Sequence, residues 1–298
     1  MPAVDPNADT IEATLRVAFG TLGRGQQKVA EFVLNRGIEA CYLPASRIAE
    51  LAEVSHSTVV RLAQSLGFDG FPNLQEVLQE QLLRGLSAPQ RLELGSSQMI
   101  VPQREGEEKA LVASLLQADI AELENMKKSF SAADFMRAVE LLDEARQIHV
   151  VGLRASAPQA LILAGGLRQI RPGCHLLEPG FGDLVDQLVD IAQDDLLVCM
   201  SYARYAKDTV RCVEYARTRG ASTVALTDSK LSPAAQLADV VLVVPTHLTY
   251  FVVSVASISL IGALLSALAL RRRDEGQVRL ERLEGLLDSF QLYVGPAG

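Results

Sequence analysis

ASRIAELAEVSHSTVVRLAQSLGF, residues 45–68, specifies the architecture of the N-terminal part of the chain. Apolar residues recur in it at helical spacing, in two short runs separated by a tight turn. Ala49 lies where two helices would cross closely and only a small residue fits. Val54, Val59 and Leu62 supply the core beneath the second run. This spacing predicts a helix-turn-helix.

The second run predicts a helix with one face free for DNA. Ser55 can cap this helix, and its first turns then present polar side chains to a major groove. The candidate DNA-binding residues are Ser55, His56, Ser57, Thr58, Arg61 and Gln64. Arg61 suits guanine or phosphate, and Gln64 suits adenine. The alternative is a small helical bundle without DNA binding, which Glu53 favours because a tight turn often has Gly there.

Further short helices flank this pair, and no strand pattern interrupts residues 24–85. Residues 86–106 contain two prolines, scattered glycine and serine and no periodicity, which is typical of a connector. We therefore expect a helix-turn-helix domain over residues 1–86, a linker over 87–106, and a second domain over 107–290.

The second domain changes to short apolar runs alternating with helical segments. It begins with helical spacing over residues 107–128, and Ser131 with Asp134 opens a further helix as a capping box. The apolar runs are QIHVVG, CHLLE, DLLVCMS, STVALTD and ADVVLVVP. Buried strands separated by helices indicate βαβ units. The overall class is α/β, with an all-α domain followed by a three-layer α/β domain around a parallel five-stranded sheet.

Composition limits the compartment and the partners. The 298 residues exceed the usual size of one domain, and 49% are hydrophobic against 21% charged, as in soluble globular proteins. The net charge is −8, and residues 1–86 hold 7 Lys and Arg against 10 Asp and Glu. DNA binding must therefore come from a local basic face and from dimerisation.

Neither a metal, a cofactor nor a leader sequence is predicted. The four cysteines lie far apart without CxxC spacing, which argues against a zinc site and a disulfide framework and fits a reducing compartment. Gly152 without a second and third glycine is too little for a dinucleotide site. The N-terminus lacks an apolar secretory segment, so we expect a cytoplasmic protein.

One apolar stretch raises the alternative of a membrane anchor. FVVSVASISLIGALLSALAL, residues 251–270, is long enough to span a bilayer and precedes three arginines. Serine and glycine dilute it, and a helix buried in an α/β domain or a dimer core is also apolar all round. We favour the buried helix and expect no membrane contact.

The segment LAEVSHSTVVRLAQSLGFDGFPNLQ, residues 51–75, resembles the N-terminal domain of the RpiR/MurR family of bacterial regulators. In that family a serine-opened recognition helix leads into an LGF-x-GF-x-x-L segment. The resemblance extends over roughly residues 20–85. It implies a transcription regulator that binds double-stranded operator DNA and carries a SIS (sugar isomerase) domain after the helix-turn-helix.

Three segments of the second domain resemble the loops of a SIS domain. GLRAS, SYARYAKDT and TDSKLSPAAQLAD are similar to the family's G-x-G-x-S, S-x-S-G-x-T and TDS-x-x-SP-x-x-x-x-AD segments. Such loops imply phosphate capture by hydroxyls and amides at the carboxyl ends of strands. Gly152, Ser156 and Ser201 keep the pattern. Arg154 replaces a glycine, and Ala203, Arg204 and Ala206 stand where serine, glycine and threonine are usual.

Two arginines thus enter loops that face one crevice in this type of sheet. Two guanidinium groups can hold a phosphate or carboxylate bidentately, so we expect a small anionic effector, a sugar phosphate or another acidic carbohydrate derivative. The candidate effector-binding residues are Gly152, Arg154, Ser156, Ser201, Tyr202, Arg204, Tyr205 and His247. The alternative is that the arginines form salt bridges at the surface or at a subunit interface. Asp228, in the TDS segment, is expected to cap the next helix.

Two other functions stay open at this point. A sugar-phosphate isomerase would need an acid and base pair, for which Glu178, His175 and His247 are available residue types. A SIS domain that has lost its ligand would be an interaction module. The helix-turn-helix has no place in isomerase chemistry, so we expect a regulator and not an enzyme. Useful DNA specificity needs two half-sites, so a dimer or tetramer is expected, with residues 107–128 and 251–270 as candidate subunit contacts.

Overall fold

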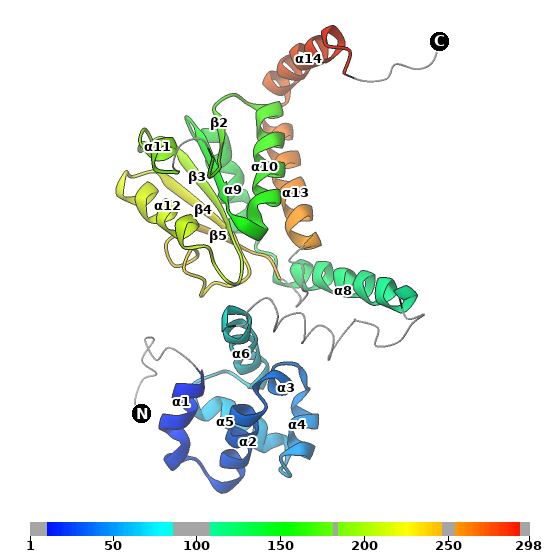
Figure 1. Cartoon of the computed structure of the whole chain (residues 1–298), viewed down its shortest axis with the longest axis vertical. Helices are drawn as coiled ribbons and strands as arrows, with labels where there is room; N and C mark the ends of the chain where they lie inside the picture. The colour runs from blue at the N-terminus through cyan, green and yellow to red at the C-terminus, as the bar shows by residue number, and fades with distance from the viewer. Residues whose placement is uncertain (1–10, 86–107, 181–183, 246–253, 293–298) are drawn as a thin grey trace. The chain divides into compact units, whose positions relative to one another are not determined.

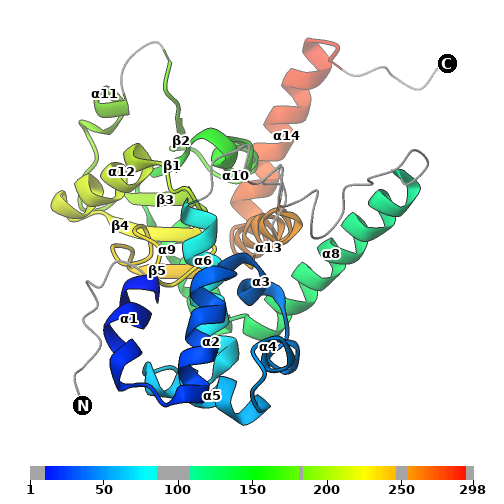
Figure 2. The same cartoon turned by 60° about the horizontal axis from the view of Figure 1, so that its bottom comes forward.

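The structure is a computed structural model that describes residues 11–85, 108–180, 184–245 and 254–292 (Figures 1 and 2). The chain divides into two compact units, an N-terminal unit, Met1–Ser87, and a C-terminal unit, Ala88–Gly298. Each unit has its own hydrophobic core.

The N-terminal unit is all helical within its described residues. Its helices are α1 (Ile11–Ala18), α2 (Arg24–Asn35), α3 (Gly37–Tyr42), α4 (Ala45–Leu51), α5 (His56–Ser65) and α6 (Phe71–Gly85). The core contains fully buried Ile48, Leu62, Phe71 and Leu74. These residues come from three of the helices and hold them as one body.

The turn between α4 and α5 shows how Glu53 can occupy a position where a helix-turn-helix often has glycine. Glu53 adopts the left-handed backbone conformation, with a φ of 52°. The next amide, Val54 N, donates to Ala49 O at 2.9 Å and closes the end of α4. The position therefore has the conformation that glycine provides at low cost, and a glutamate occupies it with some strain.

The C-terminal unit contains the predicted parallel sheet of five strands, in the order β2-β1-β3-β4-β5. The strands are β1 (Ile148–Gly152), β2 (Cys174–Leu177), β3 (Leu196–Ser201), β4 (Ser222–Thr227) and β5 (Val240–Val243). All four neighbouring pairs are parallel. The predicted fold class is confirmed.

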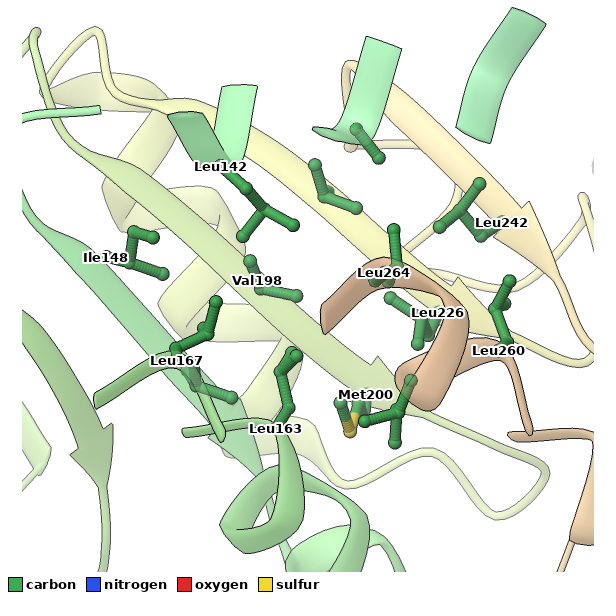
Figure 3. Packing of buried hydrophobic residues seen from close by; sticks show 14 of the residues in the cluster. Leu142, Ile148, Leu163, Leu167, Val198, Met200, Leu226, Leu242, Leu260 and Leu264 are labelled. Atoms are coloured by element: carbon green, nitrogen blue, oxygen red, sulfur yellow. The ribbon is translucent and has the colours of Figure 1, made fainter. Parts of the chain in front are cut away.

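Helices cover both faces of the sheet (Figure 1). On one face lie α9 (Ala132–Glu144), α10 (Ala157–Ile170) and α13 (Val255–Arg271), and on the other lie α11 (Leu184–Leu188) and α12 (Lys207–Thr218). Side chains of β3 alternate between two cores, Val198 and Met200 toward α10 and α13, and Cys199 toward α12 (Figure 3). The strand is buried on both faces, as a near-continuous apolar run requires.

The apolar segment near the C-terminus forms α13, one side of which packs inside the unit. Leu260, Ile261, Leu264 and Leu268 are buried against α10 and the sheet (Figure 3). A Cβ on Gly166 of α10 would lie 2.3 Å from a Leu265 methyl group, so a larger residue at this position would require the Leu265 side chain to move.

Two further helices flank this layer. The helix α8 (Glu108–Ser129) precedes α9, whose first turn is capped as predicted, because Ser131 accepts from Asp134 N. The helix α14 (Arg273–Ser289) follows α13. Within the described residues no single helix is long and apolar enough to cross a membrane, and α13 with α14 passes that test only as a pair bent by 105°.

Candidate functional site

One face of α5 is polar and exposed. His56, Ser57, Arg61 and Gln64 are exposed, and Thr58 is half-buried. The opposite face buries Val59, Leu62 and Ala63 in the core of the N-terminal unit. The predicted DNA-binding residues therefore share the outward side of one helix, which is the arrangement that a recognition helix needs.

The predicted cap of α5 is wrong in detail. Ser55 occupies the N-cap position, but its side chain makes no capping hydrogen bond to the helix backbone. Its hydroxyl lies instead 2.8 Å from the hydroxyl of Ser57 and 2.9 Å from that of Thr58. Neighbouring hydroxyls compete with the backbone amides for the same oxygen, so the first turn carries a small hydroxyl cluster.

Arg61 lies along this cluster. Its guanidinium donates to Ser57 Oγ at 3.1 Å and to Ser57 O at 3.3 Å. From α2, Gln26 Nε2 donates to Arg61 O at 3.1 Å. The backbone of the helix is thus tied to α2, while the Arg61 side chain stays on the exposed side, where its partners among the described residues are neutral oxygens of Ser57.

The second candidate site is at the carboxyl edge of the sheet, between β1 and β3. These strands are neighbours, yet the chain leaves β1 toward β2 and leaves β3 toward β4, on the opposite side. Ligands of open α/β sheets bind outside the carboxyl ends of the strands at such a switch point. The loops after β1 and β3 both end in helices, α10 and α12, whose N-termini favour anions.

Arg154 and Arg204 sit in these two loops, and both have the left-handed backbone conformation. The φ angle is 57° at Arg154 and 68° at Arg204. Both side chains are exposed. Among the described residues neither guanidinium has a salt-bridge or hydrogen-bond partner, so the alternative of surface salt bridges within the chain has no support there. Strained residues of this kind cluster at functional sites.

Gly152 and Ser156 build the floor of the first loop. A Cβ on Gly152 would lie 2.7 Å from Ser156 O and 3.0 Å from the Ala160 side chain. Gly152 is therefore needed for close packing of the strand end against α10. Ser156 is buried and precedes the first residue of α10.

Two buried hydroxyls flank the second loop. Ser201 ends β3 and Thr209 lies in the first turn of α12, and each has 2% of its surface exposed or less. Within the part of the chain that the structure describes, neither hydroxyl has a hydrogen-bond partner. Buried hydroxyls are normally satisfied, so these two are exceptions on either side of the second loop.

The two tyrosines of the second loop hold it in place. Tyr202 is buried, its hydroxyl lies 2.6 Å from Ser257 Oγ on α13, and burial raises its pKa well above the ordinary value. Tyr205 hydrogen-bonds the carboxylate of Asp228. Asp228 also accepts from Ala203 N at 2.9 Å, which corrects the expectation that it caps the next helix. Burial raises the pKa of Asp228, and these hydrogen bonds oppose the rise.

Sequence reasoning missed two further cations and one hydroxyl at this edge. Lys207 begins α12 and Lys230 follows β4, and both are exposed. The hydroxyl is that of Thr209. The signal for Lys230 is its position three residues after β4, and the signal for Lys207 and Thr209 is their position in the first turn of the helix that follows β3. His247, which the sequence offered as a further contact, lies outside the described residues.

Two of the three residues offered for isomerase chemistry, His175 and Glu178, lie on or just after the edge strand β2. His175 on β2 stacks with His149 on β1, with ring centroids 5.4 Å apart. Burial lowers the pKa of His149, with Asp195 acting in the opposite sense. Glu178 follows β2, where its backbone pairs with the Gln187 side chain. Among the described residues no group of three His, Cys, Asp or Glu side chains suits a metal ion.

Two family models match the chain. The helix-turn-helix domain of the rpiR family matches residues 10–85, and the SIS domain matches residues 141–271. The two matched ranges contain α5 and the edge between β1 and β3, respectively.

Known proteins match over one or both parts. The HTH-type transcriptional regulator HexR of Pseudomonas aeruginosa is 29% identical over 271 residues, which is 88% of this chain and 90% of HexR. The sugar isomerase domain of an RpiR transcription factor from Sphaerobacter thermophilus is 31% identical, with a TM-score of 0.56, over 58% of this chain and 98% of that domain. The Vibrio vulnificus NanR protein, solved with ManNAc-6P, covers 95% of this chain and 99% of its own at 19% identity and a TM-score of 0.56, and it shows the same fold.

Proposed function

Because the chain belongs to the RpiR family of helix-turn-helix transcriptional regulators, we propose that its SIS domain senses a small anionic metabolite and thereby controls operator binding. The observation that carries this proposal is the pair Arg154 and Arg204. Both are exposed, both have a strained backbone, and they follow the two strands that flank the switch point of the sheet.

The chemistry of the edge favours an oxyanion. Lys207 and Lys230 add two exposed positive charges after β3 and β4, and the N-termini of α10 and α12 add amide donors. Ser201 and Thr209 supply hydroxyls that lack a partner within the described chain. Arginines bind phosphate or carboxylate bidentately, so a sugar phosphate or an acidic sugar derivative fits. ManNAc-6P, the compound bound by NanR, is one such molecule.

Gly152 and Ser156 shape the effector site, and Arg154, Arg204 and Ser201 contact the ligand in this proposal. Tyr205 orients the second loop through Asp228. Tyr202 supports the loop from the core side through Ser257. His247 stays a predicted contact.

For the DNA interface we propose the exposed face of α5. Arg61 and Gln64 contact bases, and His56, Ser57 and Thr58 contact bases or phosphates at the start of the helix. Ser55 contributes its hydroxyl to the same cluster. The N-terminal unit is acidic as a whole, so binding depends on this local face and on a second copy that supplies the other half-site.

The second copy is proposed to dock on α8. Val112, Leu116 and Ile120 form an exposed apolar stripe on this helix at four-residue spacing, each at least 50% exposed. Most large side chains of α13 are buried in its own unit, and only Ile258 and Leu270 among its described residues are exposed large apolar ones. They are twelve residues apart and form no stripe, so α8 is the better of the two predicted contacts. A Leu116→Glu variant should run as a monomer in light scattering, while Glu124→Ala on the same helix should not change the assembly.

Catalysis is not part of the proposed function. The HexR and RpiR relatives are named as transcriptional regulators, and a helix-turn-helix adds nothing to an isomerase. A ligand-free interaction module is the remaining alternative. It gives no reason for two strained cations beside unsatisfied hydroxyls, whereas a ligand does.

Calorimetric titration of the full chain with a panel of sugar phosphates and inorganic phosphate tests the effector site. At least one compound is expected to bind and to raise thermal stability by mass action. Arg154→Ala and Arg204→Ala should each weaken that binding by about 1.5–3 kcal/mol. Arg137→Ala is the control, because Arg137 pairs with Glu140 on the surface of α9. No binding by the panel, or equal binding by all variants, contradicts the proposal.

A further inference from the structure

A buried carboxylate joins α8 to the start of α13. Glu122 on α8 is only 4% exposed. Ser254 Oγ donates to Glu122 Oε1 at 2.5 Å, and Ala256 N donates to the same oxygen at 3.0 Å. The carboxylate therefore lies at the N-terminus of α13, where the helix dipole and free amides stabilise negative charge.

The first turn of α13 continues these contacts to the sheet. Ser254 Oγ also accepts from Ser257 N at 3.0 Å. Ser257 is fully buried, and its hydroxyl lies 2.6 Å from the hydroxyl of Tyr202. Glu122, Ser254, Ser257 and Tyr202 thus form one continuous buried chain of contacts, which we call the Glu122 relay.

The two ends of the Glu122 relay lie at functionally different places. Tyr202 directly follows the last residue of β3 and stands two residues before Arg204. Glu122 lies on α8, the first described helix after residues 86–107, which separate it from α6 of the N-terminal unit. The relay therefore connects the proposed anion site to the helix nearest in sequence to the DNA-binding unit.

The relay is expected to form or break as a whole. Each of its groups is buried, so the loss of one contact leaves a neighbouring polar group without a partner in a medium of low dielectric. A buried carboxylate depends strongly on its donors, and two donors to Glu122 come from the N-cap and the first turn of α13. A change at Tyr202 therefore has a direct energetic consequence at α8.

We propose that Glu122 is a positioning residue that couples occupancy of the anion site to the placement of α8. The proposal rests on the proposed function and adds the contacts through which the anion site would act on α8. A ligand that binds Arg204 shifts the loop after β3 and with it Tyr202, which changes the hydrogen bond between Tyr202 and Ser257. The first turn of α13 then moves, and its hydrogen bonds to Glu122 change. Coupling between two sites is reciprocal, so a change at Glu122 must also reach the loop after β3.

Hydrogen exchange of the full chain, with and without inorganic phosphate, tests the relay. Glu122→Gln keeps the shape of the side chain but removes its charge, and Ser257→Ala removes the hydroxyl that meets Tyr202. Without phosphate, Ser257→Ala should speed exchange in residues 118–126 of α8 by about fivefold or more, the effect of one lost buried hydrogen bond. Glu122→Gln should likewise speed exchange in residues 201–209.

Ser266→Ala is the matched control, because the Ser266 hydroxyl donates to Gly262 O within its own helix, on the exposed side of α13. It should leave exchange in both segments as in the wild type. The double variant of Glu122 and Ser257 should exceed the stronger single variant by little, because both changes break one chain of contacts. Additive effects, or effects confined to the substituted helix, overturn the relay.

The measurements with phosphate distinguish a failure of the relay from a failure of the anion site. In the wild type, phosphate is expected to slow exchange in residues 201–209 and to change it in α8. Glu122→Gln should keep the first effect and lose the second, and retention of both overturns the coupling. If phosphate does not change the exchange rate of residues 201–209 in the wild type, the proposed phosphate site is wrong. The comparison of the single and double variants without phosphate then still tests the relay.

Discussion

Replacing Arg204 by glycine should make the protein more stable and less responsive at the same time. Arg204 has a φ of 68°, a conformation that costs an ordinary residue about 1–2 kcal/mol and glycine almost nothing. Glycine also gains freedom in the unfolded chain, which costs about 0.4–1 kcal/mol. The net gain is about 0.5–1 kcal/mol, or about 1–4 °C in the melting temperature of a unit of this size.

An alanine at position 204 distinguishes the effect of backbone strain from the effect of the positive charge. Arg204→Ala removes the guanidinium but keeps a Cβ and therefore the backbone strain, so its stability should lie within about 0.5 kcal/mol of the wild type. Both variants should respond to the effector only at higher concentration than the wild type, because the guanidinium is lost in each. Arg154, with a φ of 57°, should behave in the same way.

Scanning calorimetry of the full chain measures these changes, with calorimetric titration for the ligand. Glu53→Gly is the matched control, because Glu53 has a φ of 52° in the N-terminal unit and only an exposed ion pair with Lys28. It should raise the stability of that unit and leave ligand binding unchanged. A lower melting temperature for Arg204→Gly than for Arg204→Ala would refute the strain argument, and a normal ligand response of either would refute the role of the charge.

Three further predictions follow from single contacts. Arg61→Ala should weaken binding to an operator selected by the wild-type protein by about 1–3 kcal/mol in fluorescence anisotropy at fixed salt, and unchanged binding would refute the assignment of α5. Gly152→Ala should destabilise the SIS domain by about 1–3 kcal/mol in urea, because the added Cβ meets Ser156 O at 2.7 Å, and full stability would refute the close packing. Burial lowers the pKa of His149 below 6.5, so the unfolded chain binds more protons there and stability should fall as the pH drops below that value. His149→Gln should flatten this dependence in denaturation curves at several pH values, and an unchanged slope would argue against it.

Local patterns in the sequence predict the architecture well. The alternation of apolar runs and helices predicts the parallel sheet, since strands buried on both faces must be apolar along their length. The small residue Ala49 and the buried Val59 and Leu62 predict the helix-turn-helix for a similar reason. In both cases burial sets the spacing of apolar residues along the chain, so the pattern is visible without knowledge of the partner segments.

Long-range contacts escape such patterns. Nothing near Glu122 in the sequence indicates that it meets Ser254, because the two residues come together only when α8 packs against α13. Tyr202 was expected in the effector site, but its side chain lies in the core, since a strand end can direct a residue to either face. The replaced glycines at Arg154 and Arg204 were visible in the sequence, whereas the left-handed backbone at both needed the structure.

The most direct test of the account is operator affinity as a function of effector concentration, measured by fluorescence anisotropy at fixed salt. The compound that binds best in the calorimetric panel serves as effector, and the wild type is compared with the Arg154→Ala and Arg204→Ala variants. We expect the effector to change the operator affinity of the wild type by about 5- to 150-fold, the usual range of allosteric coupling. Both variants should bind the operator normally but respond only at effector concentrations about 10- to 150-fold higher, because each binds the effector more weakly by about 1.5–3 kcal/mol. A response of either variant at the same effector concentration as the wild type, or an effector that binds the wild type without changing its operator affinity, would contradict the account.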